Sequence, residues 1–466
     1  MAIASVNPAT GELLRAFEPP SHDALDELVG RAAATFDRWR RAPVAERAAV
    51  VRRAGEILER DRDRFAALMT LEMGKTLRAA EEEASKCALG CRYYADHAEA
   101  LLAAEPVAGA GPDEYVAFEP LGVVLAVMPW NFPFWQVVRF AAPALVAGNV
   151  GLLKHASNVP QCALALERLF LEAGAPGGAF TALLVGADAV EGLLADPRVA
   201  AATLTGSEPA GRQVAAAAGR HLKKTVLELG GSDPFIVLPG ADVPRAAEVA
   251  VRARAVNNGQ SCIAAKRFIV HDRVYDEFRA RFVEGVRALT VGDPMARDTD
   301  VGPLATRRIR DDLVRQVERS VAMGATLLAG GRAFDRPGNF FEPAVLEDAP
   351  PDAPVACEET FGPVAALFRV ASADEAVRVA NATPFGLGAS LWTGDRDEAR
   401  RLAPLIDAGQ LFVNGMVVSD PRFPFGGVKH SGYGRELGAY GLREFVNVKT
   451  VRMTFGDGGG TVANTE

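Results

Sequence analysis

One cysteine of the sequence stands where a nucleophile could be presented. Cys262 ends the segment 257–262, and Gly259 within that segment indicates a tight turn. A thiol attacks carbon as the thiolate, and a turn next to a helix start both exposes a thiol and lowers its pKa, so a reactive cysteine is one interpretation. The alternative is a buried structural cysteine, which is the commoner case for a cysteine taken alone. The choice depends on which other residues could assist the thiol.

A single carboxylate interrupts an apolar, strand-like run. Glu228 lies within residues 226–229 and is followed by Gly230 and Gly231. A glutamate buried among apolar side chains has a raised pKa and can act as a general base near neutral pH. The two glycines would let a cofactor or another backbone segment come close. A surface glutamate on an edge strand is the alternative.

An asparagine lies between two prolines just after an apolar run. Asn131 stands between Pro129 and Pro133 and follows residues 122–128. Its amide NH2 is a donor suited to an oxyanion that develops during a reaction. Asparagine near proline is also common turn chemistry, so this motif alone is weak.

A glycine-containing turn follows another apolar run. Residues 205–211 come after the run 199–204 and before an alanine-rich helical stretch. Glycine at a strand-to-helix turn exposes backbone N–H groups that can bind a pyrophosphate. The spacing is not that of the G-x-G-x-x-G fingerprint, so the general motif match is poor.

The elements that must position these residues alternate between strand and helix. An amphipathic helix is expected over 23–41, behind a start signal at Ser21 and Asp23, and a long helical region rich in Arg, Glu and Ala continues to about residue 102. Short apolar runs separated by helical stretches then predict strands of a parallel α/β sheet, at residues 122–128, 150–153, 181–185, 199–204, 226–229, 235–238 and 268–270. The alternation restarts after Glu228, which indicates two α/β domains. Residues 106–120 and the last fifty fit neither domain and are interpreted as arms, with a frayed end over 457–466.

The composition is that of a large globular enzyme. The 466 residues are 49% apolar and 24% charged, and the net charge is −8, which argues against a nucleic-acid partner. The longest uncharged stretch contains two prolines, and the first eight residues have neither a basic start nor an apolar core, so neither a membrane span nor a secretory leader is expected. Five unpatterned cysteines favour a reducing cytoplasm, and the six histidines show no metal-ligand spacing.

Six motifs occur in the order and spacing of the aldehyde dehydrogenase superfamily. The resemblance extends from Asn7 to about Thr450, and within the superfamily the chain is most similar to the bacterial NADP-dependent succinate-semialdehyde dehydrogenases. The motifs are residues 129–133, 204–207, 228–231, 259–262, 359–363 and 424–432. Such a set is far more specific than any of its members.

The resemblance implies an α/β fold with three parts. A Rossmann-like dinucleotide-binding domain would comprise residues 1–104 and 121–228, and a second α/β catalytic domain residues 229–415. A small β oligomerisation arm would comprise 105–120 and 416–466 and extend a partner's sheet. A homodimer or homotetramer is therefore expected.

The resemblance also implies a chemical role for each of the first motifs. Cys262 matches the nucleophile that attacks the aldehyde carbon, with the resulting oxyanion held by the Asn131 side chain and the Cys262 backbone N–H. Hydride transfer to the nicotinamide would leave a thioester, and Glu228 matches the base that activates water to hydrolyse it. No metal is required.

The implied cofactor is NADP, with NAD possible at lower preference. Lys154 and Ser157 match the pair that contacts the adenine ribose. Many NAD-preferring relatives have a glutamate at the position of Ser157, which would repel a 2′-phosphate, whereas serine can donate to it and Lys154 adds a positive charge. The remaining predicted cofactor contacts are Trp130, Asn131, His155, Ala156, Gly206, Ser207, Leu229, Glu359 and Phe361.

The substrate predicted from the resemblance is succinate semialdehyde. Arg139 matches an arginine that binds the substrate carboxylate in such enzymes, and Ser419 occupies another contacting position; a structural salt bridge is the alternative role for Arg139. The chain has Val256 where some of those enzymes have a second arginine, and Arg422 could compensate. A broad aliphatic or ω-semialdehyde dehydrogenase is therefore an alternative, and a catalytically silent binding relative is a second. The joint presence of Cys262, Glu228 and Asn131 argues against silence.

Overall fold

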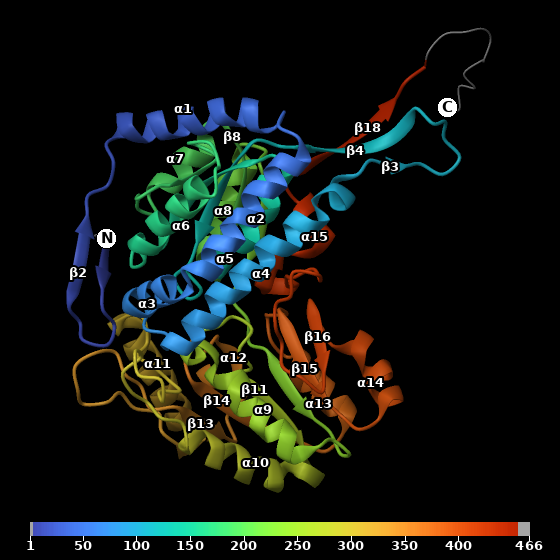
Figure 1. Cartoon of the computed structure of the whole chain (residues 1–466). Coiled ribbons are helices and arrows are strands. Elements are labelled where there is room, and N and C mark those ends of the chain that lie inside the picture. The colour runs from blue at the N-terminus through green and yellow to red at the C-terminus, as the bar shows by residue number, and fades with distance from the viewer. Residues whose placement is uncertain (1–2, 455–466) are drawn as a thin grey trace.

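A six-stranded sheet forms the centre of the upper half of the molecule (Figure 1). The computed structural model describes residues 3–454; the predicted frayed end over 457–466 lies outside them. Five strands run parallel and the short β17 is antiparallel, in the order β17-β9-β8-β5-β6-β7. Their bounds are β5 Val123–Met128, β6 Val150–His155, β7 Phe180–Ala182, β8 Val199–Thr205, β9 Lys224–Glu228 and β17 Gly432–Tyr433. The apolar runs predicted as strands therefore do form a parallel sheet.

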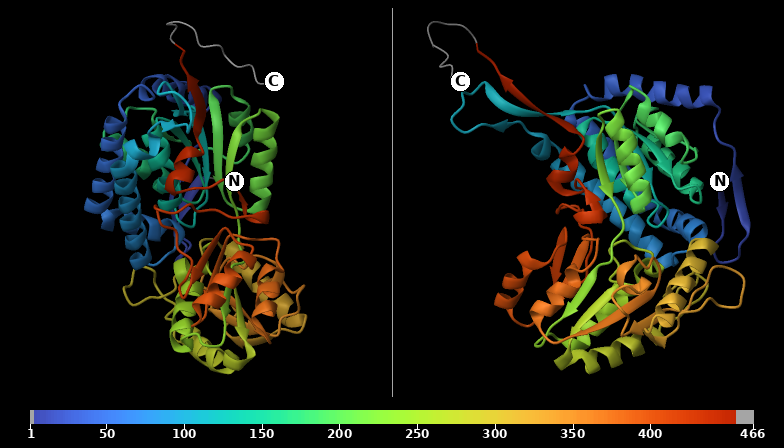
Figure 2. Two further views of the ribbon diagram at one scale, coloured as in Figure 1. Left: turned by 90° about the vertical axis from the view of Figure 1, so that its right-hand side faces the viewer. Right: turned by 180° about the vertical axis from the view of Figure 1, so that it is seen from behind.

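Helices cover both faces of this sheet. The helix α5 (Trp135–Ala147) packs against β5 and β6, and α2 (Val44–Arg60) and α4 (Leu77–Leu102) pack outside it. The helices α7 (Ala189–Ala195) and α8 (Glu208–Arg220) pack against β8, with α8 on the side opposite to α2 and α4 (Figure 2). The other helices of this half are α1 His22–Trp39, α3 Arg62–Met73 and α6 Pro160–Glu172. Ser21 caps α1 by accepting from the Ala24 N–H at 3.2 Å, which confirms the predicted helix start.

A second, seven-stranded sheet forms the lower half. Its order is β12-β13-β14-β11-β10-β15-β16, with all neighbours parallel except β12 and β13. Its strands are β10 Pro234–Val237, β11 Arg267–His271, β12 Thr326–Ala329, β13 Ala344–Glu347, β14 Val364–Val370, β15 Gly388–Trp392 and β16 Gln410–Val413. Its helices are α9 Val243–Ala255, α10 Asp272–Arg287, α11 Arg307–Ala322, α12 Pro354–Cys357, α13 Ala373–Asn381 and α14 Arg396–Leu402.

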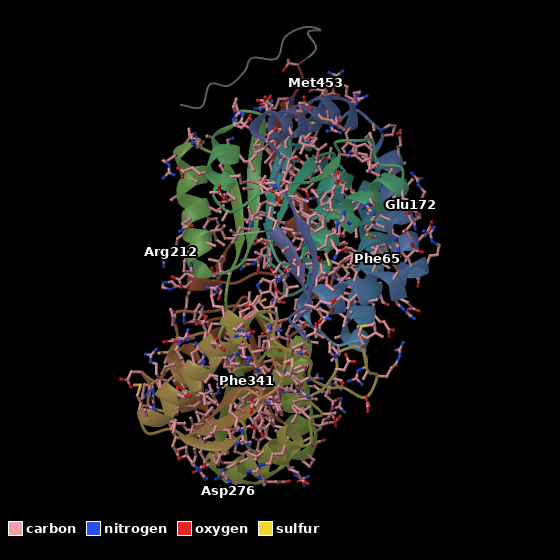
Figure 3. The ribbon with its side chains drawn as sticks, turned by 90° about the vertical axis from the view of Figure 1, so that its left-hand side faces the viewer. Phe65, Glu172, Arg212, Asp276, Phe341 and Met453 are labelled. Atoms are coloured by element: carbon pink, nitrogen blue, oxygen red, sulfur yellow. The ribbon has the colours of Figure 1, made fainter. Side chains whose placement is uncertain are left out.

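The alternation of side chains in β10 shows why its run is continuously apolar. Phe235 and Val237 pack into a cluster with α9 and α10, whereas Ile236 packs into a different cluster with α13 and α14. Because both faces are covered, every residue of the strand must be apolar. Phe65 and Phe341 lie buried inside the two halves, whereas Arg212 and Asp276 lie at the surface (Figure 3).

Two smaller sheets lie outside the main sheets. A three-stranded arm, β3 (Glu105–Pro106), β4 (Glu114–Pro120) and β18 (Val446–Arg452), projects from the upper half (Figures 1 and 2). The strands β1 (Ile3–Val6) and β2 (Leu13–Phe17) form a hairpin on the opposite side. Between β17 and β18 lies α15 (Gly438–Arg443), so the segment that precedes β18 belongs spatially to the upper half. None of the helices within residues 3–454 has the length and apolar character that a membrane crossing requires.

Candidate active site

A cavity of about 280 Å³ lies where the helices α4 and α5 meet the segment that carries Cys262. Cys262 is partly exposed at its wall. The other walls come from α4, α5, the segments 256–263 and 416–419, and Phe425. Residues more than 300 positions apart in the sequence therefore surround one thiol.

Three successive residues in the left-handed region build the turn before the thiol. Asn257 has φ 56°, Asn258 φ 58° and Gly259 φ 73°. Asparagine tolerates this region better than most residues, and glycine occupies it without steric cost. A Cβ on Gly259 would lie 2.4 Å from the carbonyl carbon of Gly362, so this position also requires a residue without a side chain. Gly259 is thus needed both for the left-handed turn and for the close contact with Gly362.

Side-chain hydrogen bonds fix this turn in place. Asn258 donates to the carbonyls of Gly74 at 2.8 Å and Pro303 at 3.1 Å, and accepts from the Gly302 N–H at 2.9 Å. Gln260 accepts from the Ala305 N–H at 2.9 Å. The buried polar side chains replace the hydrogen bonds that an irregular backbone segment would otherwise make with water.

A buried lysine holds the segment on the other side of the thiol. The Lys266 ammonium donates to three backbone carbonyls, those of Ser261 at 3.1 Å, Cys262 at 2.9 Å and Ala264 at 3.1 Å. It also lies 3.9 Å from Glu359. Lys266 was not identified from the sequence, although its place between the apolar runs 263–265 and 268–270 indicates a buried position.

The thiol itself is not pre-activated, which corrects the expectation of a lowered pKa. Burial raises the pKa of Cys262 to about 12, and the nearby cations Arg139 and Lys266 offset this only in part. No helix begins at Cys262, because residues 262–263 form a turn. The expected helix dipole is therefore absent, and desolvation of the thiolate dominates.

Asn131 lies against the turn that carries Cys262. Its Nδ2 donates to the Gln260 carbonyl at 3.0 Å, which leaves a second N–H of the amide. Asn257 Nδ2 donates to the Asn131 carbonyl at 2.7 Å and to the Gln260 carbonyl at 3.1 Å, so the two segments are tied together. The backbone N–H of Cys262 makes no hydrogen bond within residues 3–454.

A buried histidine holds the loop that carries Asn131. His155 Nε2 lies 2.9 Å from the Pro133 carbonyl, and Nδ1 lies 3.0 Å from the Ala156 N–H. Burial lowers the pKa of His155 to about 4, so the ring is neutral, and Nδ1 also lies 3.2 Å from the Met128 carbonyl. The structure thus shows a positioning contact for His155, and its role as a cofactor contact stays a prediction.

A buried ion pair, missed by sequence reasoning, fixes the start of α5. Glu83 pairs with Lys75 and accepts from the backbone N–H groups of Phe134 at 2.9 Å and Trp135 at 2.8 Å. A carboxylate at a helix N-terminus satisfies unpaired N–H groups and is stabilised by the helix dipole. No spacing in the sequence indicates this pair, because its two members approach each other only in the fold.

Glu228 ends the strand β9 and is almost fully buried. Its carboxyl oxygens have no hydrogen-bond partner among the described residues. Burial, and secondarily the nearby Glu436, raise the pKa of Glu228 well above its usual value, and Arg139 and Arg435 act in the opposite direction. This agrees with the raised pKa expected of a buried glutamate.

Because Gly230 and Gly231 have no side chains, the Glu359 side chain and the Cys262 carbonyl group can lie close to their backbone. The Gly231 N–H donates to Glu359 Oε1 at 3.0 Å. A Cβ on Gly230 would lie 2.3 Å from Glu359 Oε2, and one on Gly231 would lie 2.9 Å from the Cys262 carbonyl oxygen. The close approach predicted at these positions is thus made by Glu359 and by the Cys262 backbone.

Two further cavities contain several of the predicted cofactor contacts. One, of about 470 Å³, lies between α7 and α8 and is lined by Lys154 and Leu204 among others. Gly206 and Ser207 lie next to it at the start of α8. A second, of about 360 Å³, is lined by Glu359 and Phe361.

Four further predicted contacts, Trp130, Leu229, Ala156 and Ser157, are not among the residues that line these two cavities. Trp130 packs edge-on against Phe361 at 5.7 Å between ring centroids. Leu229 is buried beneath Gly211 of α8, and Ala156 and Ser157 follow β6.

The two predicted substrate contacts both line the cavity of Cys262. Ser419 accepts from Trp135 Nε1 at 3.0 Å and from Lys86 Nζ at 2.6 Å. Arg139 forms a buried ion pair with Glu436 and donates to Thr205 Oγ1 at 3.2 Å. Val256 lines the cavity, whereas Arg422 is paired with Asp420 at 2.6 Å and does not.

The described residues contain no candidate metal centre. Within residues 3–454 no three His, Cys, Asp or Glu side chains are grouped so that they could hold a metal ion. The groups that the structure offers for chemistry are the Cys262 thiol at the wall of one cavity, the Asn131 amide and the Glu228 carboxyl group.

Comparison with known proteins matches these features to one family. Residues 1–451 match the aldehyde dehydrogenase family. The chain is 58% identical over 454 residues to succinate-semialdehyde dehydrogenase (NADP(+)) 1 of Mycobacterium tuberculosis, covering 97% of this chain and 99% of that protein. It is 57% identical over 468 residues to succinate-semialdehyde dehydrogenase (NADP(+)) of Mycobacterium avium, covering 99% of each.

Solved structures show the same likeness. The crystal structure of succinic semialdehyde dehydrogenase from Streptococcus pyogenes in complex with NADP+ superposes with a TM-score of 0.94 at 39% identity. The match covers 97% of this chain and 100% of that one.

Proposed function

The chain belongs to the aldehyde dehydrogenase family, and from that premise we propose that it oxidises succinate semialdehyde to succinate with NADP as the oxidant. The observation that carries this proposal is the identity of 58% to a succinate-semialdehyde dehydrogenase over 97% of the chain. The catalytic, cofactor and substrate residues are likewise proposals, supported by the placement of Cys262, Arg139 and Ser419 at one cavity and of Lys154, Glu359 and Phe361 at two others.

Cys262 is the proposed nucleophile. Its Sγ attacks the aldehyde carbon and forms a thiohemiacetal, while the thiol proton must pass to a base because the pKa of about 12 keeps the thiol protonated. The oxyanion is held by the second N–H of Asn131 Nδ2 and by the backbone N–H of Cys262, which has no other partner among the described residues. The turn fixed by Asn258, Gln260 and Lys266 keeps both donors in place.

The cavity between α7 and α8 fits the adenosine part of NADP. Lys154 lines this cavity and its ammonium forms no ion pair within residues 3–454, so its charge is available for a 2′-phosphate. The N-terminus of α8, with Gly206 and Ser207 before it, offers backbone N–H groups to a pyrophosphate. Glu359 and Phe361 would hold the nicotinamide end. When bound, NADP supplies the acceptor for the hydride that leaves the thiohemiacetal carbon.

Glu228 is the proposed base for the second half of the reaction. The thioester left on Cys262 is hydrolysed by water, and a carboxylate that removes a proton from this water makes it nucleophilic. Burial raises the pKa of Glu228, which makes its carboxylate a stronger base.

The division of the chain and its assembly are also part of the proposal. Residues 1–104 and 121–228 would bind the cofactor, residues 229–415 would carry the nucleophile, and 105–120 with 416–466 would form the arm, of which β17 and α15 pack in the upper half. The projecting strands β3, β4 and β18 support a homodimer or homotetramer in which the arm extends a partner's sheet. A cytoplasmic location is supported by five cysteines that are all free.

A steady-state comparison of substrates and cofactors tests the proposed function. We expect kcat/KM to be highest for succinate semialdehyde with NADP, lower with NAD, and lower again for butanal with NADP. A wild type that oxidises butanal as well as succinate semialdehyde would instead support the broad aldehyde dehydrogenase. The mostly apolar cavity wall, with Phe132, Ile263 and Phe425, would accommodate such substrates.

A further inference from the structure

Two cationic side chains line the cavity of Cys262, and one of them is already neutralised. Arg139 is paired with Glu436, and its guanidinium also lies over the Phe425 ring at 4.7 Å. The other cation is Lys86 of α4, whose ammonium lies over the Trp135 ring at 4.7 Å but forms no ion pair within residues 3–454. Because a half-buried charge without an ion-pair partner is costly, Lys86 is the cation that a ligand anion would stabilise most.

The hydrogen bonds of Lys86 and Ser419 leave unused donors on both side chains, although the Glu82 and Glu83 carboxylates line the same cavity. Ser419 Oγ accepts from Lys86 Nζ at 2.6 Å and from Trp135 Nε1 at 3.0 Å, so both of its acceptor positions are used. The hydroxyl hydrogen of Ser419 and two N–H groups of Lys86 then remain. Three donors on two neighbouring side chains match a carboxylate, whose two oxygens accept several hydrogen bonds.

The rest of the cavity is suited to a short aliphatic chain. Cys262 lies at the wall of the same cavity, and the exposed surface of that wall is mainly apolar. The apolar contributors include Phe132, Val256, Ile263, Val417 and Phe425. A ligand that fills the cavity therefore combines an anionic end, an apolar middle and a reactive end at the thiol.

We propose that Lys86, together with Ser419, binds the carboxylate of the semialdehyde and thereby sets the preference for aldehydes that carry a terminal carboxylate. This inference rests on the proposed function, because it assigns the residue that recognises the proposed substrate. Arg139 lies nearer to Glu228 and Glu436 and stabilises that buried pair of carboxyl groups.

The electrostatics around Lys86 agree with this assignment. Burial, and secondarily Arg139, lower the pKa of Lys86 to about 8, while Cys87, Glu83 and Asp420 act in the opposite direction. A bound carboxylate would favour the ammonium form and reverse part of this shift. An anion therefore stabilises the Lys86 ammonium group better than water or an alkyl chain does.

Replacing Lys86 by methionine tests the inference, because methionine keeps most of the chain length and removes the charge. We expect kcat/KM for succinate semialdehyde to fall about 10- to 100-fold, mainly through KM, while kcat/KM for butanal changes far less. Lys86→Arg should recover part of the loss because it restores the charge. Arg92→Met removes a cation from the exposed face of the same helix and is the matched control, with no change in selectivity expected.

Equal losses for both aldehydes in Lys86→Met would overturn the inference, as would a selectivity loss confined to Arg139→Met. Thermal unfolding of each variant identifies a loss of activity that is caused by misfolding.

A binding measurement separates this inference from the proposed function. Butyrate has the carboxylate and the chain but no aldehyde, so it should slow the alkylation of Cys262 by iodoacetamide in the wild type and much less in Lys86→Met. This outcome would support the carboxylate site even if the wild type showed no preference for succinate semialdehyde. Equal protection of both proteins would show that Lys86 does not bind the anion, whatever the physiological substrate.

Discussion

At the scale of single residues, the two groups proposed to do chemistry both have pKa values raised by desolvation. Burial raises the pKa of the Cys262 thiol and of the Glu228 carboxyl group, and the neighbouring cations compensate only in part. A reactive site that is poorly ionised at rest limits unwanted reactions of the thiol. Both groups must lose a proton during the cycle, and this gives their pH dependence a definite sign.

The reactivity of Cys262 should rise with pH. Because the thiolate fraction grows about tenfold per pH unit while the pH stays below the pKa, alkylation of the free protein by iodoacetamide should accelerate steadily from about pH 7 to about pH 9. The rate at Cys262 can be measured by mass spectrometry, with Cys262→Ala reporting the reaction of the other cysteines. A plateau in the neutral range would mean that the thiol is activated without the cofactor.

Glu228→Gln should separate the two halves of the reaction. The variant should release a burst of NADPH, about one equivalent per active site, and then stall, because hydride transfer precedes the hydrolysis that needs the base. Rapid-mixing absorbance measures the burst. Cys262→Ala should show neither burst nor turnover, and a Glu228→Gln protein without a burst would place Glu228 before hydride transfer.

Ser157→Glu should shift the cofactor preference from NADP towards NAD. An added carboxylate near the 2′-phosphate should cost on the order of 1–3 kcal/mol, or about ten- to a hundredfold in the ratio of kcat/KM values. Steady-state kinetics with both cofactors measure this ratio. An unchanged ratio would indicate that Ser157 does not contact the ribose.

At the scale of elements, the nucleophile depends on a turn that no single regular element supplies. Its left-handed backbone is held by Asn258 and Gln260, and Gly259 lies directly against Gly362 and Pro363. Glu83 and His155 fix the neighbouring segment that carries Asn131. The relative position of thiol and amide is therefore set by side chains outside the reaction.

Gly259→Ala should disturb both stability and reactivity. The left-handed conformation costs alanine about 1–2 kcal/mol, and the overlap with Gly362 adds about 1–3 kcal/mol. Denaturant unfolding gives the free energy of unfolding, and a dehydrogenase assay gives kcat.

Gly11→Ala is the matched control for this change. Gly11 has a similar φ of 79° with no atom within 4 Å of an added Cβ, so it should show the backbone cost alone. Equal effects of the two changes would mean that the contact with Gly362 can relax.

At the scale of the whole molecule, the three cavities lie between and beside two separate sheets. The cavity of Cys262 is lined from α4 and α5 of the upper half and from segments 256–263 and 416–419. Two further cavities contain predicted cofactor contacts. The first is lined by residues of α7 and α8, and the second by residues of α11 and of the segment 358–361. A ligand that contacts both halves should therefore stabilise the entire fold.

NADP should raise the melting temperature more than NAD does. A ligand at one hundred times its Kd adds about 2.7 kcal/mol to the free energy of unfolding, so at equal concentration the tighter cofactor gives the larger shift. Differential scanning fluorimetry measures this, and Cys262→Ala should show the same shift because its cofactor contacts are intact. A larger shift with NAD would contradict the assignment of Lys154 to a 2′-phosphate.

The sequence by itself determined the parts of this protein that depend on local patterns. Continuous apolar runs predicted the parallel strands because strands covered on both faces expose no polar side chain, and β10 shows this directly. The start of α1 followed from Ser21, and ordered motifs around Asn131, Glu228 and Cys262 predicted the family, which the comparisons confirmed.

Only the tertiary structure decided what depends on residues that meet across the chain. The pKa of Cys262 is raised rather than lowered because desolvation, which no local pattern reports, outweighs nearby cations. Arg139 is paired with Glu436, almost 300 residues later, whereas Lys86 donates to Ser419 and forms no ion pair within residues 3–454. Sequence spacing identifies which residues could carry charge, but folding determines which charges are already compensated, and that decides which of them can bind a substrate.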